Sequence, residues 1–339
     1  MTSMPHLKKV APMRVKTKAA SVRSYTEVYS DLERFITMKL KWRGVHALVF
    51  QLLAKELRAA RVLDMGCGLG RFALLASRLA KEVDGLDMNP QAVGAADIIK
   101  ASLGISNVTF RCSDAERVKP GTQPYEVIYL GGVLQHLIEP APVLKRLRDL
   151  LAPQGLLVIN CPSEGNFRGD VATTLGKLFG FPMTLAEVRQ VNVPYMQGLC
   201  SSLGLRITRI AGCLYSRAWG DMGAQDLILR IANVLEDVKD QTVSLRVQPA
   251  VFNQWVRERA ADNQPLLDYL VNAGILKPIA RYQPFQFDDE HLERQGLPVE
   301  AIRRFFAADF SQDPYYTEQS PFNLMGGQTV YVLKRASSR

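Results

Sequence analysis

The stretch VLDMGCGLGR, residues 62–71, decides the fold class of this 339-residue chain. Residues 62–65 have the apolar pattern of a buried strand, with the acidic Asp64 near its end. Three alternating glycines follow at positions 66, 68 and 70, and a helical pattern starts at Arg71. Glycine lets the backbone approach a ligand closely, and the first turn of a helix presents unpaired N–H groups. The stretch therefore predicts a strand, a ligand-binding loop and a helix in succession.

Strand and helix patterns alternate from this stretch to residue 211. Such alternation is typical of a parallel, doubly wound α/β sheet. A last candidate strand follows a long block of helical patterns. The predicted strands are 62–65, 83–88, 108–112, 126–130, 156–160, 206–211 and 329–333, and the predicted helices are 28–57, 71–81, 90–103, 142–151, 185–203, 225–238, 252–261, 266–273 and 299–310.

Composition excludes several classes of protein. The chain is 47% hydrophobic and 22% charged, which favours a globular fold over a disordered or fibrous one. Its apolar runs are far shorter than the ~20 residues that span a bilayer, so we expect no transmembrane segment. Five cysteines without a CxxC pair indicate neither a disulfide framework nor a zinc site, and they favour a cytoplasmic location.

The net charge of +9 is unevenly distributed. Residues 1–24 carry six basic and no acidic side chains, whereas residues 217–320 carry 11 basic and 16 acidic ones. We interpret residues 1–24 as a basic flexible tail, the alternatives being an arm that touches a polyanion or membrane surface, or a transit peptide. A nucleic-acid platform would carry its basic charge on the folded part, so we expect no nucleic-acid partner.

Two more acidic residues, Asp87 and Asp114, lie at the ends of the next two predicted strands. A carboxylate after the second strand is placed to accept hydrogen bonds from both hydroxyls of a ribose. A dinucleotide-binding loop would carry its third glycine one position later, so a nicotinamide-dependent oxidoreductase is disfavoured.

Five motifs carry a family resemblance: VLDMGCGLGR (62–71), GLDMNP (85–90), CSDAE (112–116), YEVIYLGGVLQHL (125–137) and LLVINCP (156–162). In this order they resemble the class I S-adenosylmethionine-dependent methyltransferases, most of all the branch with ubiquinone-biosynthesis O-methyltransferases and many small-molecule methyltransferases. The resemblance implies a Rossmann-like fold, a mostly parallel seven-stranded sheet with an antiparallel last strand. It also implies S-adenosylmethionine as cofactor and S-adenosylhomocysteine as product. The implied segments are an N-terminal helical lid at 25–60, the cofactor-binding core at 61–216, a helical insertion at 217–320, and the last core strand and tail at 321–339.

The resemblance also assigns roles to individual residues. The implied cofactor contacts are Tyr25 on the lid helix, Arg43 near the carboxylate, Asp64 with Gly66, Cys67, Gly68 and Gly70 under the methionine part, Asp87 at the ribose, Met88 on the adenine, Asp114 and Ala115 at the adenine amino group, and Leu130 and Gly131 at the methionine amine.

Several of these residues also have a purely structural interpretation. In it, Asp64 bonds the amides of the loop, Cys67 merely fits the loop, and Met88 belongs to the core. Arg43 is then a solvated helix residue, because its spacing to the glycine loop differs by a few residues from that of the family.

Methyl transfer from a sulfonium requires alignment and exclusion of water, and an oxygen acceptor must also lose a proton. His136 lies after the fourth predicted strand, on the edge where such sheets bind ligands, so it is the candidate base. Its alternative role is to organise the loop. Candidate acceptor-binding residues are Tyr29 on the lid helix and Glu164 and Asn166 after the fifth strand, the last two being alternatively caps of the following helix.

Three other patterns are rejected as sites. Residues 192–195 and 313–316 echo the Asp/Asn-Pro-Pro-Tyr motif of amide N-methyltransferases, but that motif belongs after the fourth strand, so we interpret both as turns. Cys161 lacks the companion cysteine motif of RNA cytosine methyltransferases. The acidic residues 288–290 fit a helix N-terminus better than a metal site, and we expect no metal.

The block at 217–320 holds 12 of the 28 aromatic residues. It leaves from the carboxyl end of a parallel strand and returns to an antiparallel one, so it starts and ends at the ligand edge. We interpret it as a substrate cap, with a helical buttress or dimerisation face as the alternative; a homodimer is possible.

The family resemblance, together with these patterns, implies a methyltransferase that acts on an oxygen or nitrogen of a small organic acceptor. The alternatives are a macromolecular or lipid-linked acceptor, and a cofactor-binding scaffold without catalysis.

Overall fold

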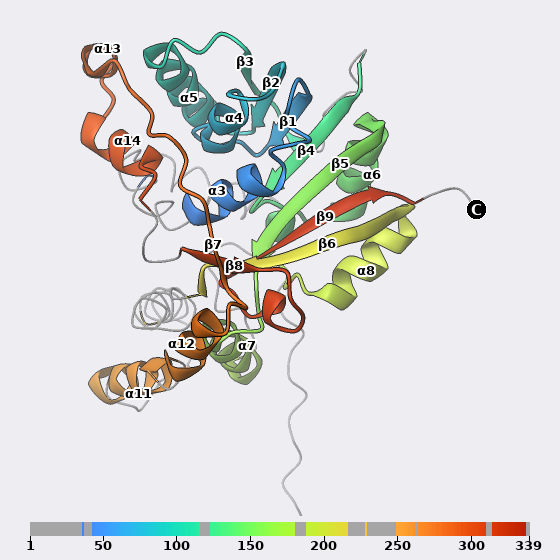
Figure 1. The fold of residues 1–339 in the computed structure, drawn as a ribbon, viewed down its shortest axis with the longest axis vertical. Coiled ribbons are helices and arrows are strands. Elements are labelled where there is room, and N and C mark those ends of the chain that lie inside the picture. The colour runs from blue at the N-terminus through green and yellow to red at the C-terminus, as the bar shows by residue number, and fades with distance from the viewer. Residues whose placement is uncertain are drawn as a thin grey trace, which may run out of the picture.

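The computed structural model describes residues 36, 43–115, 123–179, 188–215, 228, 249–261, 264–309 and 314–336. The predictions for the basic tail, for Tyr25 and Tyr29 on the lid helix, and, apart from residue 228, for the helix at 225–238 lie outside these residues. Figure 1 shows a twisted sheet through the middle of the molecule, with helices on both of its faces.

The described residues form a nine-stranded sheet in the order β3-β2-β1-β4-β5-β9-β6-β8-β7. β1 to β5 pair in parallel, and β9 runs antiparallel to both β5 and β6, as predicted. β7 and β8 are short additions from the 217–320 block, which the seven-stranded prediction lacked. The strands are β1 Arg61–Met65, β2 Glu82–Asp87, β3 Val108–Cys112, β4 Tyr125–Gly131, β5 Leu151–Pro162, β6 Leu205–Cys213, β7 Lys277–Pro278, β8 Tyr315–Thr317 and β9 Gln328–Arg335.

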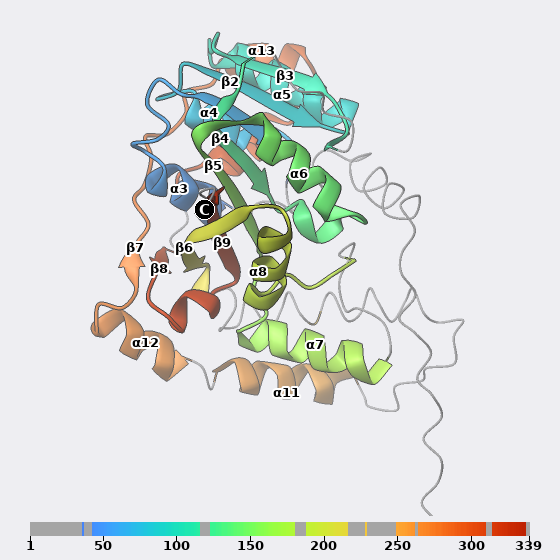
Figure 2. The ribbon, with the colours of Figure 1, turned by 90° about the vertical axis from the view of Figure 1, so that its right-hand side faces the viewer.

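Two apolar layers cover the sheet, because its central strands are apolar on both faces. On one face pack α3 (Arg43–Leu52), α4 (Arg71–Ala76) and α5 (Pro90–Ser102). On the other pack α6 (Pro140–Leu150) and α8 (Val193–Ser202), as Figure 2 shows.

The 217–320 block divides into two parts. α13 (Asp289–Arg294) and α14 (Val299–Phe306) share the apolar layer of α3 to α5. α11 (Pro249–Ala261) and α12 (Gln264–Asn272) instead gather at the end of the molecule where α7 (Phe167–Phe179) follows β5 (Figures 1 and 2). Of these described helices, α11 and α12 lie beyond the carboxyl end of β5.

Some predicted element boundaries were wrong. The helix expected at 185–203 begins at Val193, because the side chain of Asn192 caps it with a bond from the Tyr195 amide (3.0 Å), and Pro194 lies in its first turn. Residues 192–195 are thus a helix start, and Tyr315 and Tyr316 lie in a strand; neither is the turn we expected. Asp288 caps α13 as predicted.

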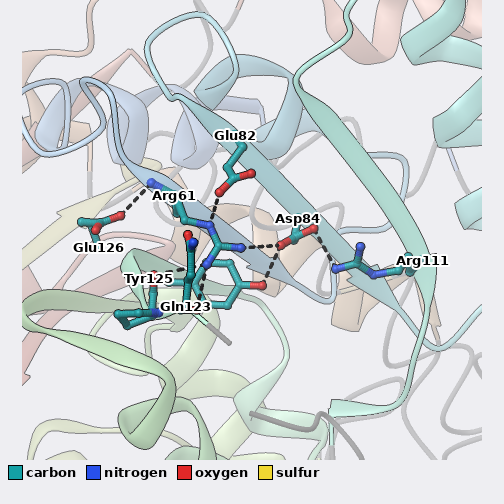
Figure 3. A network of polar contacts seen from close by, with 8 residues as sticks. Arg61, Glu82, Asp84, Arg111, Gln123, Tyr125 and Glu126 are labelled. Atoms are coloured by element: carbon teal, nitrogen blue, oxygen red, sulfur yellow. Dashed lines mark hydrogen bonds and ion pairs between the residues drawn. The ribbon is translucent and has the colours of Figure 1, made fainter. Parts of the chain in front are cut away.

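Arg61 joins three strands at the amino-terminal edge of the sheet (Figure 3). Its guanidinium contacts Glu82 and lies 3.7 Å from Asp84 on β2. Asp84 also accepts hydrogen bonds from the Tyr125 hydroxyl of β4 (2.6 Å) and from Arg111 of β3 (2.7 Å). This polar network links the strands at the edge of the sheet opposite to the glycine loop.

Candidate functional site

The loop after β1 requires glycine at each alternating position. Gly66, Gly68 and Gly70 have φ values of 77°, 53° and 77°, in the left-handed region that glycine adopts without strain. A Cβ on Gly66 would lie 2.3 Å from the Val133 side chain, so the loops after β1 and β4 touch here. Gly70 is the residue before the first turn of α4, whose N–H groups face the loop.

Asp64 supports this loop from beneath. It is 2% exposed, and its carboxylate accepts a hydrogen bond from the amide of Ala73 in α4 (3.1 Å). Burial raises the pKa of the Asp64 carboxyl from 3.8 to about 8; the Ala73 amide opposes the rise and Asp87 adds to it. Burial likewise raises the pKa of the Cys67 thiol, with Asp64 adding to the rise. This contact with α4 agrees with the interpretation of Asp64 as a residue that supports the loop.

Asp87 holds the same loop from the end of β2. Its Oδ2 accepts from the Gly68 amide (2.8 Å) and its Oδ1 from the Asn89 amide (3.0 Å). The amides of Gly66 and Cys67 both donate to the Leu86 carbonyl, at 2.7 and 3.0 Å. The structure thus brings the first glycine motif and Asp87 into direct contact.

The ends of β2 and β3 lie side by side. The Ser113 amide donates to the Asp87 carbonyl (2.8 Å), and the Cys112 thiol lies 3.6 Å from the Met88 carbonyl. Asp114 and Ala115 follow directly, partly buried. Met88 is 44% exposed, so its interpretation as a core residue is wrong.

The loop after β4 completes this edge. Leu130 is buried, Gly131 ends the strand, and the Gly132 amide donates to the Asn160 carbonyl of β5 (3.0 Å). A short 3₁₀ helix, η3 (Leu134–His136), follows and carries His136 at its end, partly buried.

The residues after β5 mainly position the next helix. The Asn166 side chain accepts from the Gly169 amide (3.0 Å) and donates to the carbonyls of Ser163 and Gly326, each at 2.9 Å. Asn166 is therefore the cap of α7, which was its alternative interpretation. Glu164 is partly buried two residues before this cap.

Arg43 begins α3, and the structure describes its backbone only. One turn later, the His46 ring lies edge-on to Tyr129, with 6.1 Å between ring centroids. α3 therefore lies over the carboxyl-terminal half of β4.

A buried polar chain beneath the edge was missed from the sequence. The Tyr129 hydroxyl donates to Asn160 Oδ1, and Asn160 Nδ2 donates to Gln328 Oε1 of β9 (2.7 Å). A Cβ on Gly131 would lie 2.6 Å from the Tyr129 ring, which occupies that space. Asn160 and Gln328 were detectable only as polar residues in otherwise apolar strands.

Arg189 was also missed. Its guanidinium donates to the carbonyls of Leu137 and Ile138 and, through Nη1, to the Tyr195 hydroxyl (3.0 Å). It thereby fastens the loop that follows His136 to the start of α8.

Comparison with known proteins agrees with this geometry. A family model described as "Methyltransferase domain" matches residues 57–218, from just before β1 to just past β6. The matched range contains the glycine loop, Asp87 and the loop after β4. It forms a class I S-adenosylmethionine-dependent methyltransferase domain.

Curated relatives of this methyltransferase domain are ubiquinone biosynthesis O-methyltransferases. The protein of Paraburkholderia xenovorans (strain LB400) is 30% identical over 130 residues, which cover 38% of this chain and 51% of that protein. The protein of Burkholderia cenocepacia is 26% identical over 194 residues, which cover 55% of this chain and 78% of that protein. The chain thus spans about half the length of the first of these relatives.

Among solved structures, magnesium protoporphyrin IX methyltransferase from Synechocystis PCC 6803 with bound SAH is 20% identical. The match covers 57% of this chain and 88% of that one, with a TM-score of 0.44, which is a loose likeness.

None of the helices in the described part of the chain is long and apolar enough to cross a membrane. Within the same ranges, no three His, Cys, Asp or Glu side chains are grouped so that they could hold a metal ion.

Proposed function

We propose that this protein transfers a methyl group from S-adenosylmethionine to an oxygen or nitrogen atom of a small organic acceptor. The observation that carries the proposal is the contact between the glycine loop and Asp87, 2.8 Å from the Gly68 amide to the carboxylate. This contact places an acidic side chain beside a loop with glycine at alternating positions, at the carboxyl edge of a parallel sheet, where such folds bind their ligands.

The residues at this edge fit the cofactor. Positive φ angles require glycine at positions 66 and 70, and the Val133 side chain and the Phe110 ring fill the space that a Cβ would take there. A carboxylate oxygen accepts more than one hydrogen bond, so Asp87 is able to bind ribose hydroxyls while it holds the loop. Met88 presents an exposed apolar surface beside it for the adenine. Asp114 follows Ser113, whose amide donates to the Asp87 carbonyl, and we assign it the amino group.

When bound, the cofactor supplies a methyl group on a positively charged sulfur, and the electron pair of the broken bond stays on that sulfur. The chain's own task is to align the acceptor, exclude water and accept a proton. We assign the role of proton acceptor to His136, at the end of η3 in the loop after β4. The names of the relatives, O-methyltransferases, favour oxygen as the acceptor atom.

The exposed apolar side chains of α11 and α12 favour one further candidate, a lipid-linked acceptor. Val251, Trp255, Leu266 and Tyr269 are exposed on these helices, at the end of the molecule that continues the carboxyl edge. Apolar surface of this kind suits an acceptor with an apolar tail. If so, turnover of a quinol-type acceptor should rise with the length of its apolar chain, and Trp255→Ser should reduce that dependence.

Calorimetry with S-adenosylmethionine and S-adenosylhomocysteine tests the cofactor assignment. We expect both to bind the wild type, and Asp87→Ala to lose about 10- to 100-fold in affinity, because charge-assisted hydrogen bonds contribute about 1.5–3 kcal/mol. Asp97→Asn, on the outer surface of α5, is the matched control and should bind normally. Folded wild type that takes up neither compound would contradict the proposal. Uptake without turnover of any acceptor would favour a scaffold instead.

A further inference from the structure

Gln135 lies at the centre of the loop after β4. Its side chain is 5% exposed, and its Nε2 lies 2.9 Å from the Gly132 carbonyl oxygen and 3.1 Å from Nε2 of His136. The side chain therefore connects the turn after Gly131 with the histidine that follows it.

The neighbour at Gly132 fixes which way the amide of Gln135 points. A carbonyl oxygen only accepts hydrogen bonds, so the amide atom beside it must be the NH₂ group. The reversed amide would set two acceptors against each other. The NH₂ group has a second hydrogen, and the nitrogen that lies in reach of it is Nε2 of His136.

This contact determines the state of the His136 ring. A ring nitrogen that accepts a hydrogen bond carries no proton, so the neutral ring holds its hydrogen on Nδ1. Adding a proton to Nε2 would break the contact with Gln135. The arrangement thus selects one of the two neutral tautomers.

The backbone around Gln135 is held independently of its side chain. The Val188 amide donates to the Gln135 carbonyl (2.9 Å), and Arg189 donates to the carbonyls of Leu137 and Ile138. Within the described residues, Gln135 Oε1 is buried without a hydrogen-bond partner. The amide is consequently held through its NH₂ group alone, and replacing it should leave the backbone of the loop in place.

We propose that Gln135 is a positioning residue that keeps His136 in the tautomer with an unprotonated Nε2. This is the tautomer that can take a proton from an acceptor hydroxyl, once that hydroxyl replaces the Gln135 amide as the donor to Nε2. The catalytic half of the proposal rests on the proposed methyl transfer; the tautomer itself does not.

Nuclear magnetic resonance of ¹⁵N-histidine-labelled protein reads the tautomer directly. In the wild type at a pH where the ring is neutral, we expect His136 to show a protonated Nδ1 and an unprotonated Nε2. In Gln135→Leu the proton should move to Nε2 in a large fraction of molecules. Gln135→Asn keeps the amide but is one methylene shorter, so it should have the same effect and serves as a second variant. The resonances of His46 and His291 should not change, and Gln190→Leu, exposed on the neighbouring segment, should leave His136 unchanged.

Kinetics add the functional readout. Gln135→Leu should lower kcat about tenfold or more, as expected when a general base is misprotonated, with affinity for S-adenosylhomocysteine within twofold of wild type. The proposal would be overturned, whatever the activity, if the His136 ring of the wild type were protonated on Nε2. It would also be overturned if the tautomer of His136 were the same in Gln135→Leu as in the wild type. A loss of cofactor affinity equal to the loss of kcat would assign Gln135 a structural role instead. If the wild type methylates nothing, the proposed function fails and the tautomer is still decided by the spectra.

Discussion

At the scale of single residues, Asp64 lies buried in β1, beneath the glycine loop. Its carboxyl is fully buried, and its pKa rises to about 8 because burial disfavours the charged form. In the unfolded chain the same group ionises near its ordinary value of 3.8. Above that pH the unfolded state has lost a proton that the folded state must keep, so folding becomes less favourable as the pH rises.

This linkage predicts a pH dependence that Asp64→Asn should remove. Between about pH 4 and 8, Asp64 should lower the free energy of unfolding of the wild type by up to ~1.4 kcal/mol per pH unit. An asparagine oxygen still accepts from the Ala73 amide but cannot ionise. Urea unfolding at pH 5, 6, 7 and 8 measures the difference, with Asp97→Asn as the exposed control. Parallel pH profiles for wild type and Asp64→Asn would show that the buried carboxyl does not titrate in this range.

Local signals made part of the site predictable. The spacing of Gly66, Gly68 and Gly70 between a strand and a helix predicts the loop, because the positive φ values of its backbone require glycine at these positions. Asp87 ends the next strand, and parallel strands bring their carboxyl ends to one edge. Gln135 gave no signal, because its role depends on an amide hydrogen placed between two neighbours of the folded loop.

At the scale of elements, β4, β5 and β9 are joined by side chains as well as by their ladders. Tyr129, Asn160 and Gln328 form one buried chain of hydrogen bonds across the three strands. Each member is a polar group in an apolar layer, so removing one leaves its partner buried and unsatisfied.

Asn160→Ala should therefore destabilise the fold more than its size suggests. It strips both the Tyr129 hydroxyl and Gln328 Oε1 of a partner, and we expect a loss of about 2–5 kcal/mol in the free energy of unfolding. Tyr129→Phe breaks only one of the two bonds and should cost about 1–3 kcal/mol. Tyr269→Phe, on the exposed face of α12, is the control and should change the stability by less than ~0.5 kcal/mol. Equal effects of Asn160→Ala and Tyr129→Phe in urea unfolding would show that the chain does not act as a unit.

Some elements were predicted poorly, for physical reasons. The apolar pattern before α8 extended the expected helix to residue 185, although Asn192 and Pro194 are a helix start by their own chemistry. β7 and β8 are two and three residues long, too short for any periodicity to show in the sequence. Their pairing depends on β6, which lies far away along the chain.

At the scale of the whole molecule, the described helices of the 217–320 block lie in two different places. Topology could predict that it starts and ends at the ligand edge, and α11 and α12 lie there. Its aromatic content could not distinguish a cap from a buttress, since aromatic side chains suit both. In the structure, Phe305 and Phe306 of α14 are buried in the layer over α4, which is the buttress alternative for that part of the block.

The buttress also reaches the cofactor loop. The Arg71 guanidinium, directly after Gly70, is 1% exposed and lies over the Phe305 ring, 3.7 Å from its centroid. A desolvated contact of this kind contributes about 2 kcal/mol. Because Arg71 begins α4, this contact couples the position of the insertion to the helix end that faces the glycine loop.

Phe305→Leu should therefore weaken cofactor binding as well as the fold. We expect the free energy of unfolding to fall by about 2 kcal/mol and the dissociation constant for S-adenosylhomocysteine to rise about fivefold or more, a typical coupling between linked sites. Leu270→Ala is the control, because Leu270 belongs to the same block and is fully buried, but in the separate apolar cluster of Tyr215 and α12. That variant should lose stability but keep its cofactor affinity. Thermal unfolding and calorimetry on the two variants separate the effects. An unchanged affinity in Phe305→Leu would show that α14 supports the stability of the fold but not cofactor binding.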